Sequence, residues 1–156
     1  MSIFIPTLAA WTGAAAALLI VGTLRAEEYA IDQMIYTNLG AYSGRFHVRW
    51  NTACGVRCRA WLQGSRNADE NETVVVDLDR NSEFKFVSGT PETCALNEGD
   101  EVWGFVDFYW GESDSCRQSA KMRYRPLSSG SVTYLTRGTT QDKNRCRLNT
   151  KPTIKW

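Results

Sequence analysis

The sequence predicts an all-β, single-domain protein, and three observations carry that prediction. Short apolar runs alternate with turn residues at intervals of about eight to twelve positions. The stretch 101–110 is apolar or aromatic at both alternations, which is typical of a central strand. Five cysteines follow an apolar N-terminal segment, which indicates an exported, disulfide-stabilised chain. We expect an antiparallel sandwich, with a small barrel as the alternative architecture.

The expected strands are separated by Gly, Asn, Asp, Ser or Pro, and no stretch after residue 26 has a convincing helical period. They span Tyr29–Thr37, Arg45–Trp50, Arg57–Gln63, Thr73–Asp79, Glu83–Val87, 101–110, Ser119–Arg125, Ser131–Arg137, Arg145–Leu148 and Ile154–Trp156. The turn residues 79–82 and 126–130 predict two hairpins, one joining the runs on either side of each turn.

Residues 1–26 are interpreted as a secretory signal peptide and residues 27–156 as the mature β domain. The stretch Ile3–Leu24 carries no charge and contains the continuous apolar run Ala14–Val21. An uncleaved single-span membrane anchor is the alternative, because residues 3–24 are long enough to cross a bilayer of about 30 Å. In both cases the remaining chain lies outside the cytosol.

Cysteine usage predicts two disulfides and one leftover thiol. The candidates are Cys54, Cys58, Cys94, Cys116 and Cys146. Cys116 and Cys146 flank the expected hairpin of residues 119–137, so we expect them to pair, with Cys94 joined to Cys54 or Cys58. The leftover thiol is either inert or links two chains into a dimer. No metal or cofactor is expected, because Cys54 and Cys58 lack zinc-knuckle spacing and the chain has a single histidine.

Charge is segregated along the chain. Residues 69–114 hold 13 acidic residues against two basic ones, whereas residues 115–156 hold ten Lys or Arg against one acid. Two interpretations stay open: a dipolar surface with separate acidic and basic partners, or neutralisation by pairing across one sheet. A basic surface would suit an anionic polysaccharide, lipid headgroups or nucleic acid, and nucleic acid is the least natural partner outside the cytosol.

The candidate ligand-binding residues are Trp103, Asp107, Tyr109, Arg123 and Arg125. Alternation along 101–110 places Trp103, Asp107 and Tyr109 on one face, where the rings could stack on a sugar while the carboxylate accepts hydrogen bonds from its hydroxyls. The competing interpretation buries these rings in the core and pairs Asp107 with an arginine of a neighbouring strand. Arg123 and Arg125 represent the basic C-terminal third.

Two further positions are singled out by residue type. His47 lies between Arg45 and Arg49 on the polar face of the strand 45–50, and a secreted nuclease-like hydrolase could use it as an acid or base. Nothing local supplies a matched carboxylate, and the neighbouring arginines would lower the pKa of His47. Asn71 starts an Asn-Glu-Thr glycosylation signature.

No nucleophile elbow, phosphate-cradling loop or calcium loop is present in the sequence. The sequence therefore predicts an exported, non-catalytic domain that recognises a protein or a glycan, since Trp, Tyr and Arg dominate binding hot spots. The alternatives are a small secreted hydrolase using His47, and an assembly subunit tethered by its N-terminal segment or by an interchain disulfide.

Overall fold

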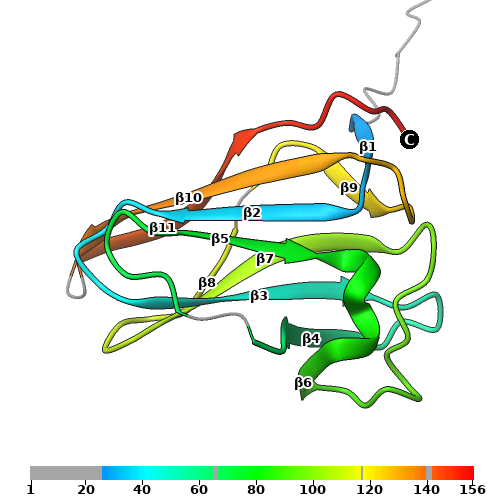
Figure 1. Cartoon of the computed structure of the whole chain (residues 1–156), viewed down its shortest axis with the longest axis horizontal. Coiled ribbons are helices and arrows are strands. Elements are labelled where there is room, and N and C mark those ends of the chain that lie inside the picture. Colours follow the sequence, from blue (N-terminus) through cyan, green and yellow to red (C-terminus); the bar gives the residue numbers. More distant parts are fainter. Residues whose placement is uncertain (1–25, 65–66, 117, 140–141) are drawn as a thin grey trace, which may run out of the picture.

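A computed structural model of the chain describes residues 26–64, 67–116, 118–139 and 142–156, and it shows two β-sheets packed face to face (Figure 1). The expected signal peptide or anchor, residues 1–26, lies outside the described residues but for its last position. Within the described ranges, no helix is long and apolar enough to span a membrane.

Sheet A has the strand order β1-β9-β7-β3-β4-β6, with the short strand β8 paired to β7. Its strands are β1 (Glu28–Ile31), β3 (Gly44–Asn51), β4 (Arg57–Leu62), β6 (Phe84–Ser88), β7 (Glu101–Phe108), β8 (Asp114–Ser115) and β9 (Lys121–Tyr124).

Sheet B has the strand order β11-β10-β2-β5. Its strands are β2 (Gln33–Asn38), β5 (Thr73–Asp77), β10 (Ser131–Thr139) and β11 (Asp142–Thr150). A 3-10 helix, η1 (Leu78–Glu83), crosses from β5 in sheet B to β6 in sheet A. The predicted sandwich is confirmed and the barrel alternative is not formed, although two strand pairs, β1 with β9 and β2 with β10, are parallel.

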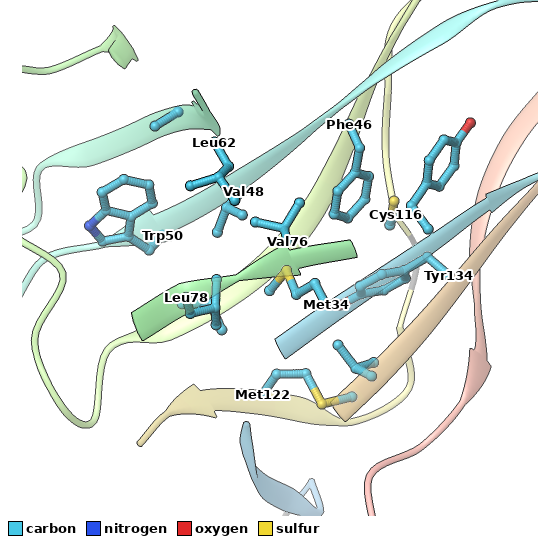
Figure 2. Close-up of a cluster of buried hydrophobic side chains, with 14 of the residues drawn as sticks. Met34, Phe46, Val48, Trp50, Leu62, Val76, Leu78, Cys116, Met122 and Tyr134 are labelled. Atoms are coloured by element: carbon cyan, nitrogen blue, oxygen red, sulfur yellow. The ribbon is translucent and has the colours of Figure 1, made fainter. Parts of the chain in front are cut away.

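The core fills the space between the two sheets (Figure 2). Alternation decides which side chains enter it: Phe46, Val48 and Trp50 of β3 point inward, as their spacing predicts. Across the layer, the ring of Tyr36 from β2 stacks on Phe46 with a centroid distance of 5.0 Å. The Tyr36 hydroxyl hydrogen-bonds to the hydroxyl of Thr136 at 2.7 Å, so this buried polar group is satisfied.

Both expected hairpins are wrong, for one physical reason. The strands on either side of residues 79–82 belong to different sheets, because η1 lifts the chain from β5 to β6. Residues 126–130 likewise connect β9 in sheet A to β10 in sheet B. Turn residues in a sequence predict that the chain reverses direction. They do not predict whether the next strand joins the same sheet or the opposite one. The hairpin partner of β10 is β11, which is longer than the expected run 145–148.

The structure contains two disulfides, Cys58–Cys94 and Cys116–Cys146. The second joins the pair that the sequence placed together, although it connects the two sheets and not the ends of a hairpin: Cys116 follows β8 in sheet A and Cys146 belongs to β11. Gly104 in β7 makes room for it, since a Cβ there would lie 2.9 Å from the Cys116 sulfur. The free cysteine is Cys54, exposed in the β3–β4 turn. Two disulfides indicate an oxidising compartment.

The edge strand expected at 154–156 is reduced to an isolated bridge between Tyr29 and Lys155. The strand expected at 29–37 is divided at Asp32 into β1 and β2, which enter different sheets. In both places the chain leaves one sheet for the other, a tertiary event that the local residue pattern does not encode.

Candidate functional site

The outer face of sheet A, the one turned away from sheet B, carries an unusual mixture of arginines and aromatic rings. We call it the arginine–aromatic face. It is built by alternate residues of three adjacent strands and the turn after β7: Arg45, His47, Arg49, Arg57, Arg59, Trp61, Trp103, Phe105, Asp107, Tyr109 and Trp110. Their neighbours in sequence point into the core, so the strand pleat fixes which side chains belong to this face.

Cross-strand register decides which of these side chains meet. Pairing of β3 with β7 sets Arg45 opposite Asp107 and His47 opposite Phe105. Pairing of β3 with β4 sets Arg49 opposite Arg59. Residues directly opposite have neighbouring Cβ atoms, so one carboxylate is surrounded by several cations.

Phe105 lies at the centre of the arginine–aromatic face and is covered by guanidinium groups. The Arg49 guanidinium carbon lies 3.6 Å from the centre of the Phe105 ring and that of Arg59 lies 4.9 Å from it. Phe105 is consequently only 5% exposed, although no second sheet covers it. As the sequence predicts, β7 is a central strand; arginine side chains and not a second sheet cover its outer face, and they leave Trp103 and Asp107 partly exposed.

Asp107 is the acidic centre of the cluster. Its Oδ2 lies 3.0 Å from Nε2 of His47, and its Oδ1 lies 3.7 Å from Nη1 of Arg59. The Ser113 hydroxyl donates a hydrogen bond of 2.6 Å to Oδ1. The carboxylate still has 37% of its side-chain surface exposed, so it remains open to a ligand. An arginine partner for Asp107 was one of the two sequence-based interpretations, whereas the His47 contact was not foreseen.

His47 is buried, with 3% of its side chain exposed. Its Nε2 contacts Asp107 outside hydrogen-bond alignment, and its Nδ1 has no hydrogen-bond partner among the described residues. Burial lowers the pKa of His47 to about 4; Arg59, Arg45 and Arg49 add to this, and Asp107 opposes it. The imidazole is therefore neutral at physiological pH.

Two concavities open on the arginine–aromatic face. The first, the aromatic cleft, has a volume of about 550 Å³ and is lined by Arg45, His47, Trp61, Val87, Asp107, Phe108, Tyr109 and Trp110. The guanidinium of Arg45 lies 4.6 Å from the centre of the Trp61 ring and donates a 3.0 Å hydrogen bond to Asn67, so the side chain of Arg45 is held in position against Trp61. The second, the arginine cleft, has a volume of about 490 Å³.

The turn that follows β7 presents two aromatic side chains to solvent. Tyr109 is 49% exposed and Trp110 is 92% exposed. Trp110 also has a φ of 63°, a left-handed conformation that is strained for a bulky side chain. The strained backbone lowers the stability of the fold, and the exposed tryptophan adds no buried surface to offset that cost. Features of both kinds concentrate at binding sites.

The structure brings together three of the five candidate binding residues. Trp103, Asp107 and Tyr109 lie on the arginine–aromatic face. Arg123 lies outside both clefts on β9, the strand next to β7, where it is opposite Glu101 and forms a two-pronged ion pair with Glu28. Arg125 lies over the ring of Trp156 at 4.5 Å. A ligand role for these two arginines stays a prediction, and each has a partner within the chain.

Several residues of the face were not among the sequence-based candidates. They are Arg45, Arg49, Arg57, Arg59, Trp61 and Trp110. The outward alternation of Arg45 and Arg49 was a usable signal, whereas the β3–β4–β7 neighbourhood that unites these residues was not readable from the chain. The glycosylation candidate Asn71 lies elsewhere, exposed before β5.

Among the residues that the structure describes, no group of three or more His, Cys, Asp or Glu side chains is placed to hold a metal ion. The charge segregation of the sequence is partly neutralised by ion pairs between the acidic and basic stretches. Glu101 of β7 approaches Lys121 of the neighbouring strand β9 at 3.7 Å, and Glu98, in the loop before β7, approaches Arg125 at 3.9 Å.

Known proteins resemble this chain only weakly. No protein-family model and no curated protein sequence matches the chain. Matching solved structures include a non-hemolytic pneumolysin from Streptococcus pneumoniae (TM-score 0.37, 13% identity), the human-specific toxin intermedilysin (0.35, 16%) and listeriolysin O (0.35, 12%). Each alignment covers 76% of this chain, which spans only 22–23% of the matched chains. TM-scores this low assign neither a fold family nor a function, so function is inferred from the site.

Proposed function

We propose that this protein is a non-catalytic binding domain that recognises a glycan outside the cytosol through the arginine–aromatic face. The observation that carries the proposal is Trp110, which is 92% exposed, held in a left-handed backbone conformation and placed at the rim of the aromatic cleft. Neither packing nor backbone preference accounts for a tryptophan there.

The aromatic cleft has the chemistry that sugar recognition requires. Its rings offer flat apolar surfaces, and Tyr109 and Trp110 are exposed enough to stack on a ligand. Asp107 and Arg45 supply an acceptor and a donor for hydroxyl groups in the same cleft. A concave cleft with rings and a few convergent polar groups favours a small ligand such as a sugar over a flat protein surface.

A panel of immobilised glycans, neutral and acidic, tests the proposal. We expect the wild-type protein to bind a subset of the panel and Trp110→Ala to lose at least about tenfold in affinity for that subset. Leu127→Ala is the matched control, since Leu127 is also 86% exposed with a left-handed backbone but lies outside both clefts. Unchanged affinity of the Trp110 variant, or the absence of any glycan that the wild-type protein binds, would contradict the proposal.

The hydrolase alternative is favoured by one observation, the 3.0 Å contact between His47 and Asp107. Two properties of His47 argue against it. Its side chain is 97% covered, and its pKa of about 4 makes it a weak base at neutral pH. Replacement of His47 by Ala separates the two functions: a hydrolase would lose most of its turnover on an oligonucleotide substrate, whereas a binding domain shows no turnover in the wild-type protein either.

A further inference from the structure

The arginine cleft lies beside the aromatic cleft on the same face of sheet A, and its lining is cationic. Three of the residues around it are arginines, and the others are neutral: Arg49, Asn51, Arg57, Cys58, Arg59, Ser88, Trp103 and Ser115. None of them is acidic. Asp107 is the single carboxylate among the described residues that line the two clefts together, against four arginines. The face therefore carries an excess of positive charge.

The guanidinium groups of Arg49 and Arg59 are held in position before any ligand arrives. Both stack on the Phe105 ring, and Nη1 of Arg49 also donates a 3.0 Å hydrogen bond to the Ser115 hydroxyl. Only 23% of the Arg59 side chain is exposed. Side chains that are already ordered lose little conformational entropy on binding, and the planar guanidinium fork matches carboxylate and sulfate oxygens in pairs.

The positive charge of these arginines is only partly compensated, because Asp107, 3.7 Å from Nη1 of Arg59, is the single carboxylate among the described residues that line the two clefts. Arg49 and Arg59 are directly opposite each other across β3 and β4, and like charges in that register repel. Burial, followed by the charge of Arg59, lowers the pKa of Arg49, and the charge of Asp107 opposes this shift without cancelling it. Arg57, at the open rim of the cleft, has no ion pair among the described residues. An anion seated between the three guanidiniums would relieve the repulsion and occupy their free donors.

We propose that the arginine cleft is an anion subsite that seats a carboxylate or sulfate group of an acidic glycan, while another sugar of the same glycan stacks in the aromatic cleft. The inference rests on the proposed function and specifies its ligand class. Arg45 and Arg49 are four residues apart on β3, a span of about 13 Å at the usual strand rise. One sugar ring does not bridge that span, so the ligand is an oligosaccharide.

The test uses the full mature domain and a heparin hexasaccharide, which carries both groups, with its desulfated and carboxyl-reduced derivatives. Calorimetric titration at fixed ionic strength gives the affinities. We expect Arg57→Ala to weaken binding of the hexasaccharide about 10- to 100-fold, and Arg57→Lys to recover only part of the loss, because lysine keeps the charge without the fork. Arg80→Ala is the control, since it removes the same charge from an exposed position on η1, outside both clefts and in a cavity whose lining holds no other cation.

The derivatives identify the anion: the one that loses affinity lacks the group that the cleft holds. Three results would overturn the subsite: equal effects of the Arg57 and Arg80 variants, full affinity of both derivatives, or unchanged affinity of Arg57→Ala. If Trp110→Ala still abolishes binding in any of these cases, the proposed glycan-binding function survives and the anion subsite alone is rejected. If the wild-type protein binds neither the hexasaccharide nor any glycan of the panel, both proposals fail.

Discussion

Replacement of Trp110 by glycine is expected to make the protein more stable while it weakens ligand binding. The φ of 63° at this position places an L-amino acid in the left-handed region, where the clash of Cβ with the backbone costs about 1–2 kcal/mol. Glycine has no Cβ and adopts this conformation freely. The tryptophan is 92% exposed, so its removal sacrifices almost no buried apolar surface.

The magnitude follows from two opposing contributions. Relief of the strain adds about 1–2 kcal/mol to the free energy of unfolding. The greater freedom of glycine in the unfolded chain subtracts about 0.4–1 kcal/mol. We therefore expect a net gain of about 0–1.6 kcal/mol, centred on about 0.8 kcal/mol. It is measured by urea unfolding followed by far-UV circular dichroism, which does not depend on the fluorescence of the deleted ring. Trp110→Ala, which keeps the Cβ, should stay within about 0.5 kcal/mol of the wild type.

Leu127 provides the matched control, because it is 86% exposed with a φ of 54° and lies outside both clefts. Its backbone N–H donates a hydrogen bond to Asp79, which a glycine retains. Leu127→Gly should raise stability by a similar amount and leave glycan binding unchanged. A Trp110→Gly protein that is less stable than the wild type by more than about 1 kcal/mol would refute the reasoning, because it would mean that the indole contributes packing to the fold.

Three further predictions concern stability. Replacing both Cys116 and Cys146 with Ala should lower the free energy of unfolding by about 3.6 kcal/mol, the loop entropy for a separation of 30 residues; a loss below about 1 kcal/mol in urea titrations would contradict this. The pKa of His47 in the folded protein lies below the value of about 6.5 in the unfolded chain, so the unfolded chain binds more protons between these two values. The free energy of unfolding should therefore fall as the pH drops from about 6.5 to about 4, by up to about 1.4 kcal/mol per pH unit. His47→Gln should flatten that slope in the same urea titrations. Gly130→Ala would set a Cβ 2.1 Å from the Ala30 carbonyl oxygen and should cost at least about 1–3 kcal/mol, visible as a lower melting temperature; an unchanged one would show that the backbone yields.

The binary pattern of β3 shows how far local sequence carries. Alternation alone assigned Phe46, Val48 and Trp50 to the core and Arg45 and Arg49 to the outside, and the structure agrees. The same alternation placed His47 on a solvated face, yet this residue is buried. The pleat predicts the direction of a side chain. What covers the side chain depends on Asp107 and Phe105, which belong to another strand.

The candidate site divides in the same way. Trp103, Asp107 and Tyr109 were recognisable because a carboxylate among aromatic residues stands out within one strand. Arg57, Arg59 and Trp61 were not, since nothing in their own strand distinguishes them from any polar edge. They become part of the site because β4 pairs with β3, which in turn pairs with β7.

The sequence by itself determined the class of fold, the disulfide-bearing character and the inward and outward faces of the strands, because these follow from composition and from a period of two residues. Only the tertiary structure decided which strands are neighbours, where the chain crosses between the sheets, and that His47 meets Asp107. Strand pairing depends on contacts between residues that are remote in sequence. Each passage of the chain from one sheet to the other buries the apolar faces of strands that are far apart in the sequence. The binding face is thus a product of register, and register is a property of the assembled sheets.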